Sequence, residues 1–225
     1  MFFDPLYMAV MIVGALLSFG TQFWVKSRFN RYSQVGLHNT MTGAEVAAAI
    51  LRAQGVRGVR IEAIGGFFSD HYDPSAKVLR LSPDVFSGRS VAAAGVAAHE
   101  VGHAIQDAAG YWPMRMRQKM VPVAGIGSNL GVLLIVAGLF VGLTQLSMVG
   151  VMLFGGFVLF TLVTLPVEFD ASYRAHNILV ESGLVTASES AGVRSVLMAA
   201  AATYLASAAT AVLQLLYWIS VARRD

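Results

Sequence analysis

Four long stretches without a charged residue constrain this sequence more than any other feature. They cover residues 5–25, 121–145, 146–165 and 195–222. A helix of about 20 apolar residues crosses the roughly 30 Å core of a bilayer, so each stretch is long enough to be a transmembrane helix. The composition agrees, because 56% of the residues are hydrophobic and only 13% are charged, which is too apolar for a soluble globule. The sequence predicts a mainly α-helical membrane protein with about four transmembrane helices.

The first and last stretches each have an alternative interpretation. A cleaved signal peptide would also be apolar, but residues 5–25 follow Asp4 instead of basic residues and lack a small-residue cleavage site. We therefore expect a permanent span. Residues 195–222 are rich in Ala and include Ser, Thr and Gln214, so this helix could cross the membrane or lie packed on protein.

Positive charge is distributed unevenly along the chain. Residues 26–120 carry most of the 16 Lys and Arg residues, including a basic cluster at 115–119 beside the second span. The positive-inside rule then places residues 26–120 and 166–194 together in the cytoplasm, with only Arg223 and Arg224 on the opposite side. We expect the basic cluster to anchor this topology. No nucleic-acid-binding motif is present, so the predicted surroundings are the lipid bilayer.

The segment between the first two spans has the pattern of a small α+β portion. Thr42 and Glu45 have the spacing of a capping box ahead of a short helix. Strand-like runs follow at 59–64 and 77–82, separated by turn-rich residues. Residues 90–110 are Ala-rich and free of proline, which predicts a longer helix. We expect one membrane-embedded domain, residues 1–225.

The longer predicted helix carries the sequence His99-Glu100-Val101-Gly102-His103. One helical turn separates the two histidines, so both imidazoles can reach a single Zn²⁺ at about 2.0–2.1 Å. Glu100 is rotated by about 100° from His99 and can face a water molecule without occupying a coordination position. The pattern predicts a catalytic zinc site with Glu100 as general base. The alternative is an amphipathic helix with ordinary histidines.

A catalytic zinc usually takes three protein ligands, and the chain contains no cysteine, which leaves His, Asp or Glu for the third. The other histidines do not form the extended motif of metzincins. Glu168 is the preferred candidate, because it follows the third span on the side where the charge distribution places His99. Asp170 competes with it, although only one of the two can face the metal from a helix.

Several stretches resemble the YugP-like neutral zinc metallopeptidases, bacterial membrane proteins of the gluzincin type with distant HtpX-like relatives. The matching stretches are 69–74, 78–86, 89–111 and 166–175. The resemblance implies a gluzincin-like catalytic portion on the cytoplasmic face of the bacterial inner membrane, with His99, His103 and Glu168 as zinc ligands and Glu100 as the base.

One position departs from the wider gluzincin pattern, in which an aspartate follows the third ligand by four residues. This chain has Ser172 there. The carboxylate that should orient a ligand imidazole is then Asp170, Asp107 or absent.

The resemblance further implies hydrolysis of peptide bonds in protein or peptide substrates, including membrane proteins. Glu100 would take a proton from the attacking water and pass it to the leaving amine. His71 or His176 could donate a hydrogen bond to the oxyanion. By analogy, the run at 77–82 would be an edge strand that aligns an extended substrate.

Two other functions compete with this interpretation. An intramembrane site-2-type protease would carry the motif inside a spanning helix, but residues 90–106 are short for a span and no matching third-ligand motif follows. An inactive zinc-stabilised scaffold would need only the ligands, yet Glu100 is retained. Small residues at 155–157 and in the last span could pack within one subunit or build a homo-oligomer or membrane-protein complex.

Overall fold

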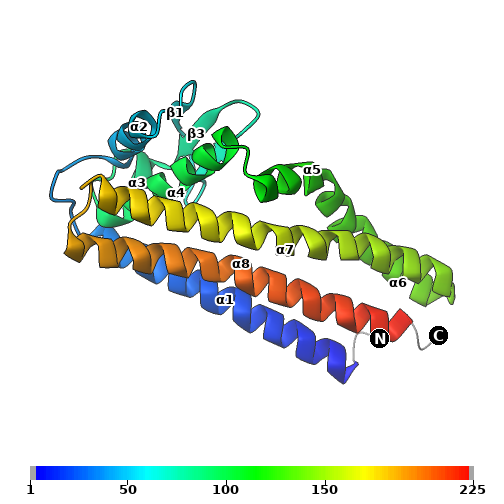
Figure 1. Cartoon of the computed structure of the whole chain (residues 1–225). Helices are drawn as coiled ribbons and strands as arrows, with labels where there is room; N and C mark the ends of the chain where they lie inside the picture. The colour runs from blue at the N-terminus through cyan, green and yellow to red at the C-terminus, as the bar shows by residue number, and fades with distance from the viewer. Residues whose placement is uncertain (1–3, 223–225) are drawn as a thin grey trace. The chain divides into compact units, whose positions relative to one another are not determined.

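A computed structural model of the chain describes residues 4–222, so Arg223 and Arg224 lie outside the described residues (Figure 1). Nearly all of its elements are helices, accompanied by three short strands. The chain forms two compact units. The helical unit consists of Met1–Thr21, Arg115–Pro166 and Thr203–Asp225, and the mixed unit of Gln22–Met114 and Val167–Ala202.

Four helical segments are long and apolar enough to cross a membrane, as predicted. Three are single helices, α1 (Pro5–Ser33), α7 (Thr144–Glu181) and α8 (Ala187–Ala222). The other consists of α5 (Trp112–Ile126), the π-helical turn η1 (Gly127–Gly131) and α6 (Val132–Val141). The fold is thus mainly helical, with four candidate membrane-spanning helices and a small sheet.

Helix α7 differs from the predicted span at 146–165 in both its start and its length. It begins at Thr144, shortly after a turn at Gly142, which has a left-handed φ of 73°. The helix then continues through Pro166 for 38 residues in all, although the sequence predicts a boundary near 165. Glu168 therefore lies within the same continuous helix as the third apolar stretch.

Within the helical unit, glycines let α7 approach the preceding segment closely. A Cβ at Gly131 would lie 2.9 Å from the backbone N of Phe154, and one at Gly150 would lie 2.6 Å from the carbonyl O of Gly131. Such contacts between small residues are typical of membrane helix pairs. Gly155, in the run at 155–157 that the sequence suggests for packing, has nothing within 4 Å of its Cβ position.

The mixed unit contains a three-stranded sheet. It is built from β1 (Arg60–Ala63), β2 (His71–Asp73) and β3 (Val78–Leu81), in the order β1-β3-β2. Strand β3 pairs parallel with β1 and antiparallel with β2. The expectation that 77–82 forms an edge strand is therefore wrong. The cause is β2, which occupies the side of β3 that a substrate would need.

Strand β2 lies inside the stretch that the sequence shows as turn-rich. It has only three residues, and the carboxylate of Asp73 accepts hydrogen bonds from the backbone N–H groups of Ser75 and Ala76, both at 3.0 Å. This Asx-type turn folds the chain back onto β3. A strand this short leaves no alternation of polar and apolar residues to detect.

Three helices lie entirely within the mixed unit. They are α2 (Gly43–Ala53), α3 (Pro83–Phe86) and α4 (Val91–Ala108). The predicted capping box of Thr42 and Glu45 is present at the start of α2. Ser90 caps α4 by accepting a hydrogen bond from the backbone N–H of Ala93 at 3.2 Å. The first alanines of α4 are fully buried, so neighbouring elements surround this helix closely.

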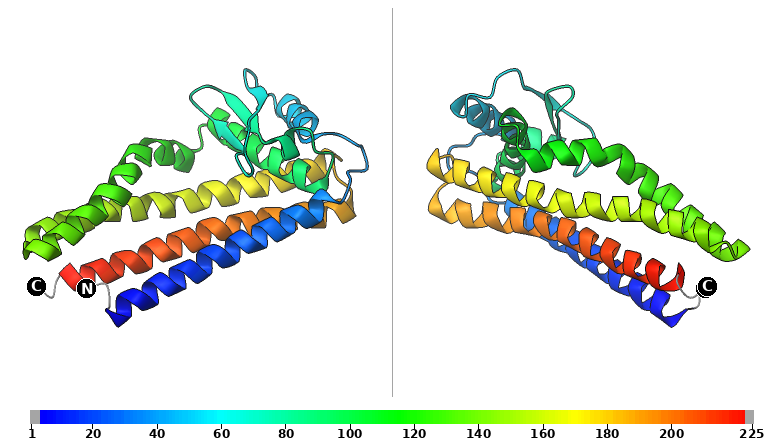
Figure 2. Two further views of the ribbon diagram at one scale, coloured as in Figure 1. Left: turned by 180° about the vertical axis from the view of Figure 1, so that it is seen from behind. Right: turned by 45° about the vertical axis from the view of Figure 1, so that its right-hand side comes forward.

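Helices α4 and α7 approach each other closely at Gly102. A Cβ at this position would lie 2.7 Å from the carbonyl O of Ala171, a backbone atom that cannot swing aside. Figure 2 shows α4 beside the C-terminal part of α7 from two directions. Because His99 and Glu168 lie on these two helices, Gly102 controls the distance between them.

Replacing Gly102 by alanine is expected to separate the two helices. Overpacking of this kind costs about 1–3 kcal/mol, so the melting temperature and the zinc affinity of the full chain should both fall. Gly155→Ala is the matched control on α7, because its Cβ meets nothing within 4 Å. Thermal unfolding of both variants in detergent measures the difference. Equal stability of the two variants would show that the Gly102 contact is unimportant.

Candidate metal centre

Three side chains that are distant in the sequence meet inside the mixed unit. His99 and His103 extend from one face of α4, and Glu168 extends from α7, 69 positions after His99. Their ligand atoms all lie within 4.8 Å of one another, and the three residues are buried. Glu168 is only 1% exposed. A carboxylate is rarely buried this deeply without a cationic partner or a metal ion.

The distances within this group match a zinc coordination sphere. Glu168 Oε2 lies 3.2 Å from His99 Nε2 and 3.5 Å from His103 Nε2. Ligand atoms about 2.0–2.1 Å from a tetrahedral zinc ion are separated from one another by about 3.3–3.4 Å. Two imidazoles and one carboxylate are also a ligand set used by catalytic zinc sites. The residues present therefore fit a zinc ion.

The outer nitrogen of each imidazole has its own hydrogen-bond partner. For His99 this partner is the Ser172 hydroxyl, whose Oγ lies 3.1 Å from Nδ1. The partner of the His99 ring is thus a neutral hydroxyl and not a carboxylate. A hydrogen bond at Nδ1 orients the ring and leaves Nε2 directed at the metal position.

Gln106 has the corresponding role for His103. Its Oε1 lies 3.0 Å from His103 Nδ1, while its Nε2 donates to the carbonyl O of Val167 and to Asp170, both at 2.8 Å. Because the amide nitrogen serves these two acceptors, the amide oxygen accepts from the Nδ1–H of His103. Gln106 is fully buried. It was not predicted, although its position three residues after His103 puts it on the same helix face.

Asp170 is not a member of the three-residue group, as expected for a residue two positions after Glu168 on a helix. Its carboxylate accepts from Gln106 and, at 2.6 Å, from the guanidinium of Arg174. It acts on His103 only through Gln106. Ser172 thus contacts a histidine of the group directly, whereas the candidate Asp170 contacts one only through Gln106.

Asp107 lies at the end of α4 and has a different set of contacts. It accepts a hydrogen bond from the Tyr72 hydroxyl at 2.8 Å and pairs with the Lys77 ammonium at 2.5 Å. Burial, followed by the hydrogen bond to this carboxylate, raises the pKa of the Tyr72 phenol well above its usual value. Asp107 therefore ties β2 and the residue that precedes β3 to α4.

His71 and His176 have partners outside the three-residue group. His71 Nδ1 lies 2.7 Å from the carbonyl O of Ser69, and its Nε2 lies 3.3 Å from Arg80. His176 Nε2 lies 2.9 Å from the Ser190 hydroxyl. The candidate metal-binding group among residues 4–222 includes neither of these two histidines. Their role as oxyanion donors stays a prediction.

Protons and a metal ion would compete for His103. Burial opposes the charged imidazolium, but hydrogen bonding to Glu168 and the negative charges of Glu168 and Glu100 outweigh it and raise the pKa of His103. Without a metal ion, a proton on His103 neutralises part of this charge. A divalent cation could take over the same task.

Glu100 is 8% exposed, and no described residue forms a hydrogen bond or ion pair with it. Its negative charge acts on His103 and on Asp70. Burial raises the pKa of the Asp70 carboxyl, two hydrogen bonds from Ser82 oppose this, and the charge of Glu100 adds to it. The Glu100 carboxylate is thus available to a bound molecule.

Ser172→Ala is expected to weaken zinc binding of the full chain, because His99 loses the partner that orients its ring. Loss of such a partner typically costs about 10–100-fold in metal affinity. Ser190→Ala is the matched control, since Ser190 also contacts an imidazole but that of His176, at 2.9 Å. Competition with a fluorescent chelator measures both affinities. If both variants bind zinc equally well, Ser172 has no role at the site.

Comparison with known proteins places the chain in a family. A family described as "Putative neutral zinc metallopeptidase" matches residues 7–223. The chain is 43% identical over 216 residues to "Putative membrane protease YugP" of Bacillus subtilis (strain 168), and the match covers 96% of each of the two chains. No solved structure matches it. The chain, which has four candidate membrane spans and a His-His-Glu group among its described residues, belongs to this neutral zinc metallopeptidase family.

Proposed function

We propose that this protein is a zinc-dependent membrane endopeptidase in which His99, His103 and Glu168 hold the metal and Glu100 is the general base. The observation that carries the proposal is the three-residue group, because its spacing suits tetrahedral zinc and its two imidazoles are each oriented from outside. Family membership supports a protease role and zinc as the metal.

In this proposal, the chain's own residues position the reactants and move the proton. Zinc bound at the group would polarise the scissile carbonyl and acidify a water molecule. Glu100, which is next to His99 in the sequence and has no partner among the described residues, takes the proton of the attacking water. It then passes this proton to the leaving amine. Ser172 and Gln106 keep the two imidazoles in place throughout.

The arrangement supports a gluzincin-type catalytic portion. Its features are a histidine pair on α4 with the glutamate between them in the sequence, and a third carboxylate on a later helix. The hydroxyl of Ser172 would replace the orienting aspartate of other gluzincins. A neutral partner polarises an imidazole less than a carboxylate does, so we expect the zinc of this protein to be held less tightly.

We also propose that the site faces the cytoplasm at the inner membrane of a bacterium. The distribution of Lys and Arg supports this orientation, because residues 26–120 carry 12 of the 16 Lys and Arg residues and precede the second span. The four candidate spans do not include α4, which favours a site beside the membrane over an intramembrane protease. Its substrates would then be cytoplasmic proteins or parts of membrane proteins.

The proposal is tested by comparing the protein fragments in membranes that contain either the wild-type chain or the Glu100→Gln variant. Peptides cut only in the presence of the wild-type chain would support a protease and identify its substrates. Glu181→Gln is the matched control, because Glu181 ends α7 and is exposed. Identical fragments in all three samples, with zinc bound in each, would instead support a scaffold that binds proteins without cutting them.

A further inference from the structure

Two adjacent phenylalanines in the loop between β1 and β2 are exposed to solvent. Phe67 is 52% exposed and Phe68 is 42% exposed. Their ring centroids are 4.1 Å apart, and both rings pack edge-on against Phe29 of α1, at 5.9 and 5.2 Å. Phe29 itself is buried. Each of the two rings therefore has one side fixed on α1 and another side uncovered.

The backbone of this loop adopts unusual angles that keep both rings outside. Phe68 has a φ of 55°, and Gly66 has a φ of 110°. A left-handed conformation is uncommon for a bulky residue and costs energy. The surrounding contacts hold it in place, since Ser69 donates a hydrogen bond to the carbonyl O of Gly66 at 3.1 Å. Both rings are exposed on this turn of the chain, and Phe29 is the aromatic residue on which they pack.

The position of Phe29 on helix α1 indicates how deep the loop lies relative to the bilayer core. Its uncharged run begins at Pro5 and ends before Lys26, and at about 1.5 Å per residue this run matches the bilayer core of roughly 30 Å. Phe29 lies three residues beyond Lys26, or about 4.5 Å along the axis. Helical side chains lean toward the N-terminus of their helix, so the ring of Phe29 leans back toward the core. Phe67 and Phe68 pack on it at this boundary.

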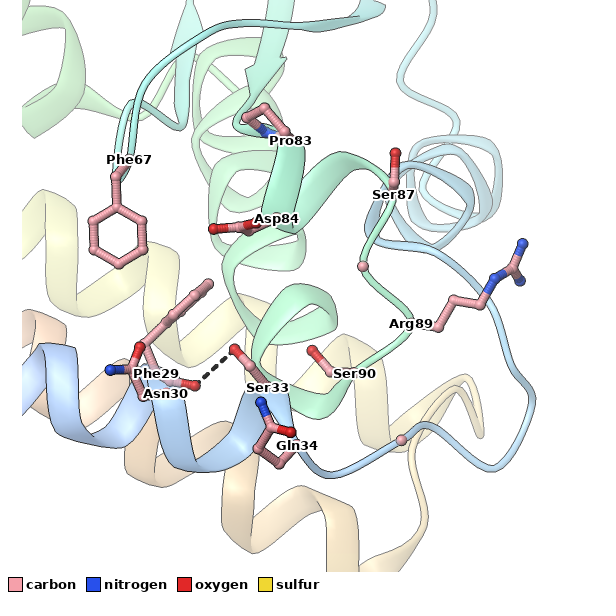
Figure 3. A pocket seen from close by; sticks show the side chains of 12 residues that line it. Phe29, Asn30, Ser33, Gln34, Phe67, Pro83, Asp84, Ser87, Arg89 and Ser90 are labelled. Atoms are coloured by element: carbon pink, nitrogen blue, oxygen red, sulfur yellow. Dashed lines mark hydrogen bonds between the residues drawn. The ribbon is translucent and has the colours of Figure 1, made fainter.

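Basic, polar and aromatic side chains surround the loop, as is typical of proteins at the headgroup layer of a membrane. The basic residues Lys26, Arg28 and Arg31 of α1 lie at the same level, where they can bind anionic phosphates. Figure 3 shows Phe67 beside Phe29 at a cavity of about 720 Å³, which the polar side chains of Asn30 and Ser33 also line. Aromatic rings next to polar groups are typical of the membrane interface.

We propose that the loop carrying Phe67 and Phe68 inserts its two rings into the interface of the bilayer, so that phospholipid covers them. The same loop leads directly to Asp70, whose charge interacts with Glu100. It would therefore hold the candidate metal centre at a fixed height beside the membrane and favour polypeptide segments that emerge from the bilayer. The insertion depends on α1 crossing the membrane, and not on peptidase activity.

Site-directed spin labelling of the full chain tests this insertion. The sequence contains no cysteine, so Phe67→Cys and Phe68→Cys each give one labelled site while the other ring stays in place. The protein is reconstituted in vesicles of phosphatidylethanolamine and phosphatidylglycerol. Collisions with oxygen, which is enriched in lipid, are compared with collisions with a water-soluble nickel chelate. Phe23→Cys on α1 is the lipid reference, and Ser75→Cys in the β2–β3 turn is the water reference.

We expect the ratio of oxygen to nickel collisions at 67 and 68 to be several-fold higher than at Ser75 and to approach that at Phe23. A ratio equal to that at Ser75 would overturn the proposal. Low collision rates with both reagents would also overturn it, because they would show that protein, such as a second copy of the chain, covers the rings. Neither result would bear on zinc binding or on peptide cleavage.

Discussion

Glu168→Gln is expected to lower the zinc affinity of the full chain by more than about 100-fold. Losing a residue that merely orients a ligand already costs about 10–100-fold, and this substitution removes a ligand together with the only negative charge among the three donors. The amide would remain buried between the two imidazoles, because Glu168 is 1% exposed. Zinc content after dialysis against a graded series of chelator concentrations measures the effect.

The control for this variant is Glu181→Gln on the same helix, an exposed position at which the same substitution should leave zinc binding unchanged. Circular dichroism of both variants shows whether the helices are retained. If Glu168→Gln keeps the helices and still binds zinc as tightly as the wild type, the third ligand is a different residue.

Glu100→Gln is expected to reduce the rate of peptide cleavage by about 10²–10⁴-fold, the usual contribution of a positioned general base. Glutamine has nearly the same shape as glutamate but cannot accept the proton of the attacking water. Zinc binding should be retained, because Glu100 is outside the group of three ligand atoms. The assay uses a peptide that the wild-type chain cuts, and zinc content is measured in the same samples.

Loss of both activity and zinc in Glu100→Gln would assign a structural role to this residue and not a catalytic one. Unchanged activity with zinc bound would require another base. Asp70 is then the first residue to replace, because its carboxylate is close enough for its charge to interact with that of Glu100.

The parts of the site that could be predicted depend on local periodicity and on chain order. His99 and His103 are four residues apart, which fixes them on one face of any helix. Glu168 was found because it follows an apolar span that must end near the polar segment. Both inferences hold without knowledge of the tertiary structure, and the structure brings these three residues together.

The residues that orient the histidines could not be chosen from the sequence, because their roles depend on how two helices are placed against each other. Ser172 contacts His99 across the α4–α7 interface, over 73 positions of sequence. Gln106 is local to His103, but only the carbonyl of Val167 and the carboxylate of Asp170 determine which way its amide points. Likewise, the sequence does not show that Gly102 is needed for the close contact of α4 with the backbone of Ala171.

The order of the strands in the sheet also could not be predicted from the sequence. The run at 77–82 has the composition of a strand, but composition does not show whether a strand has one neighbour or two. The three residues of β2 pair with β3 after a tight turn and convert it into the central strand. The free edges of this sheet are β1 and β2, so a substrate that adds a strand would have to pair with one of these.

X-ray absorption at the zinc edge of the purified full-length protein tests the central claim most directly. We predict one zinc ion per chain, with only nitrogen and oxygen neighbours at about 2.0–2.2 Å. The spectrum should also contain the outer-shell scattering of two imidazoles. In the His99→Ala variant, any zinc that is retained should show the scattering of one imidazole. A spectrum without imidazole scattering, or one that is the same in the wild type and in His99→Ala, would contradict the account.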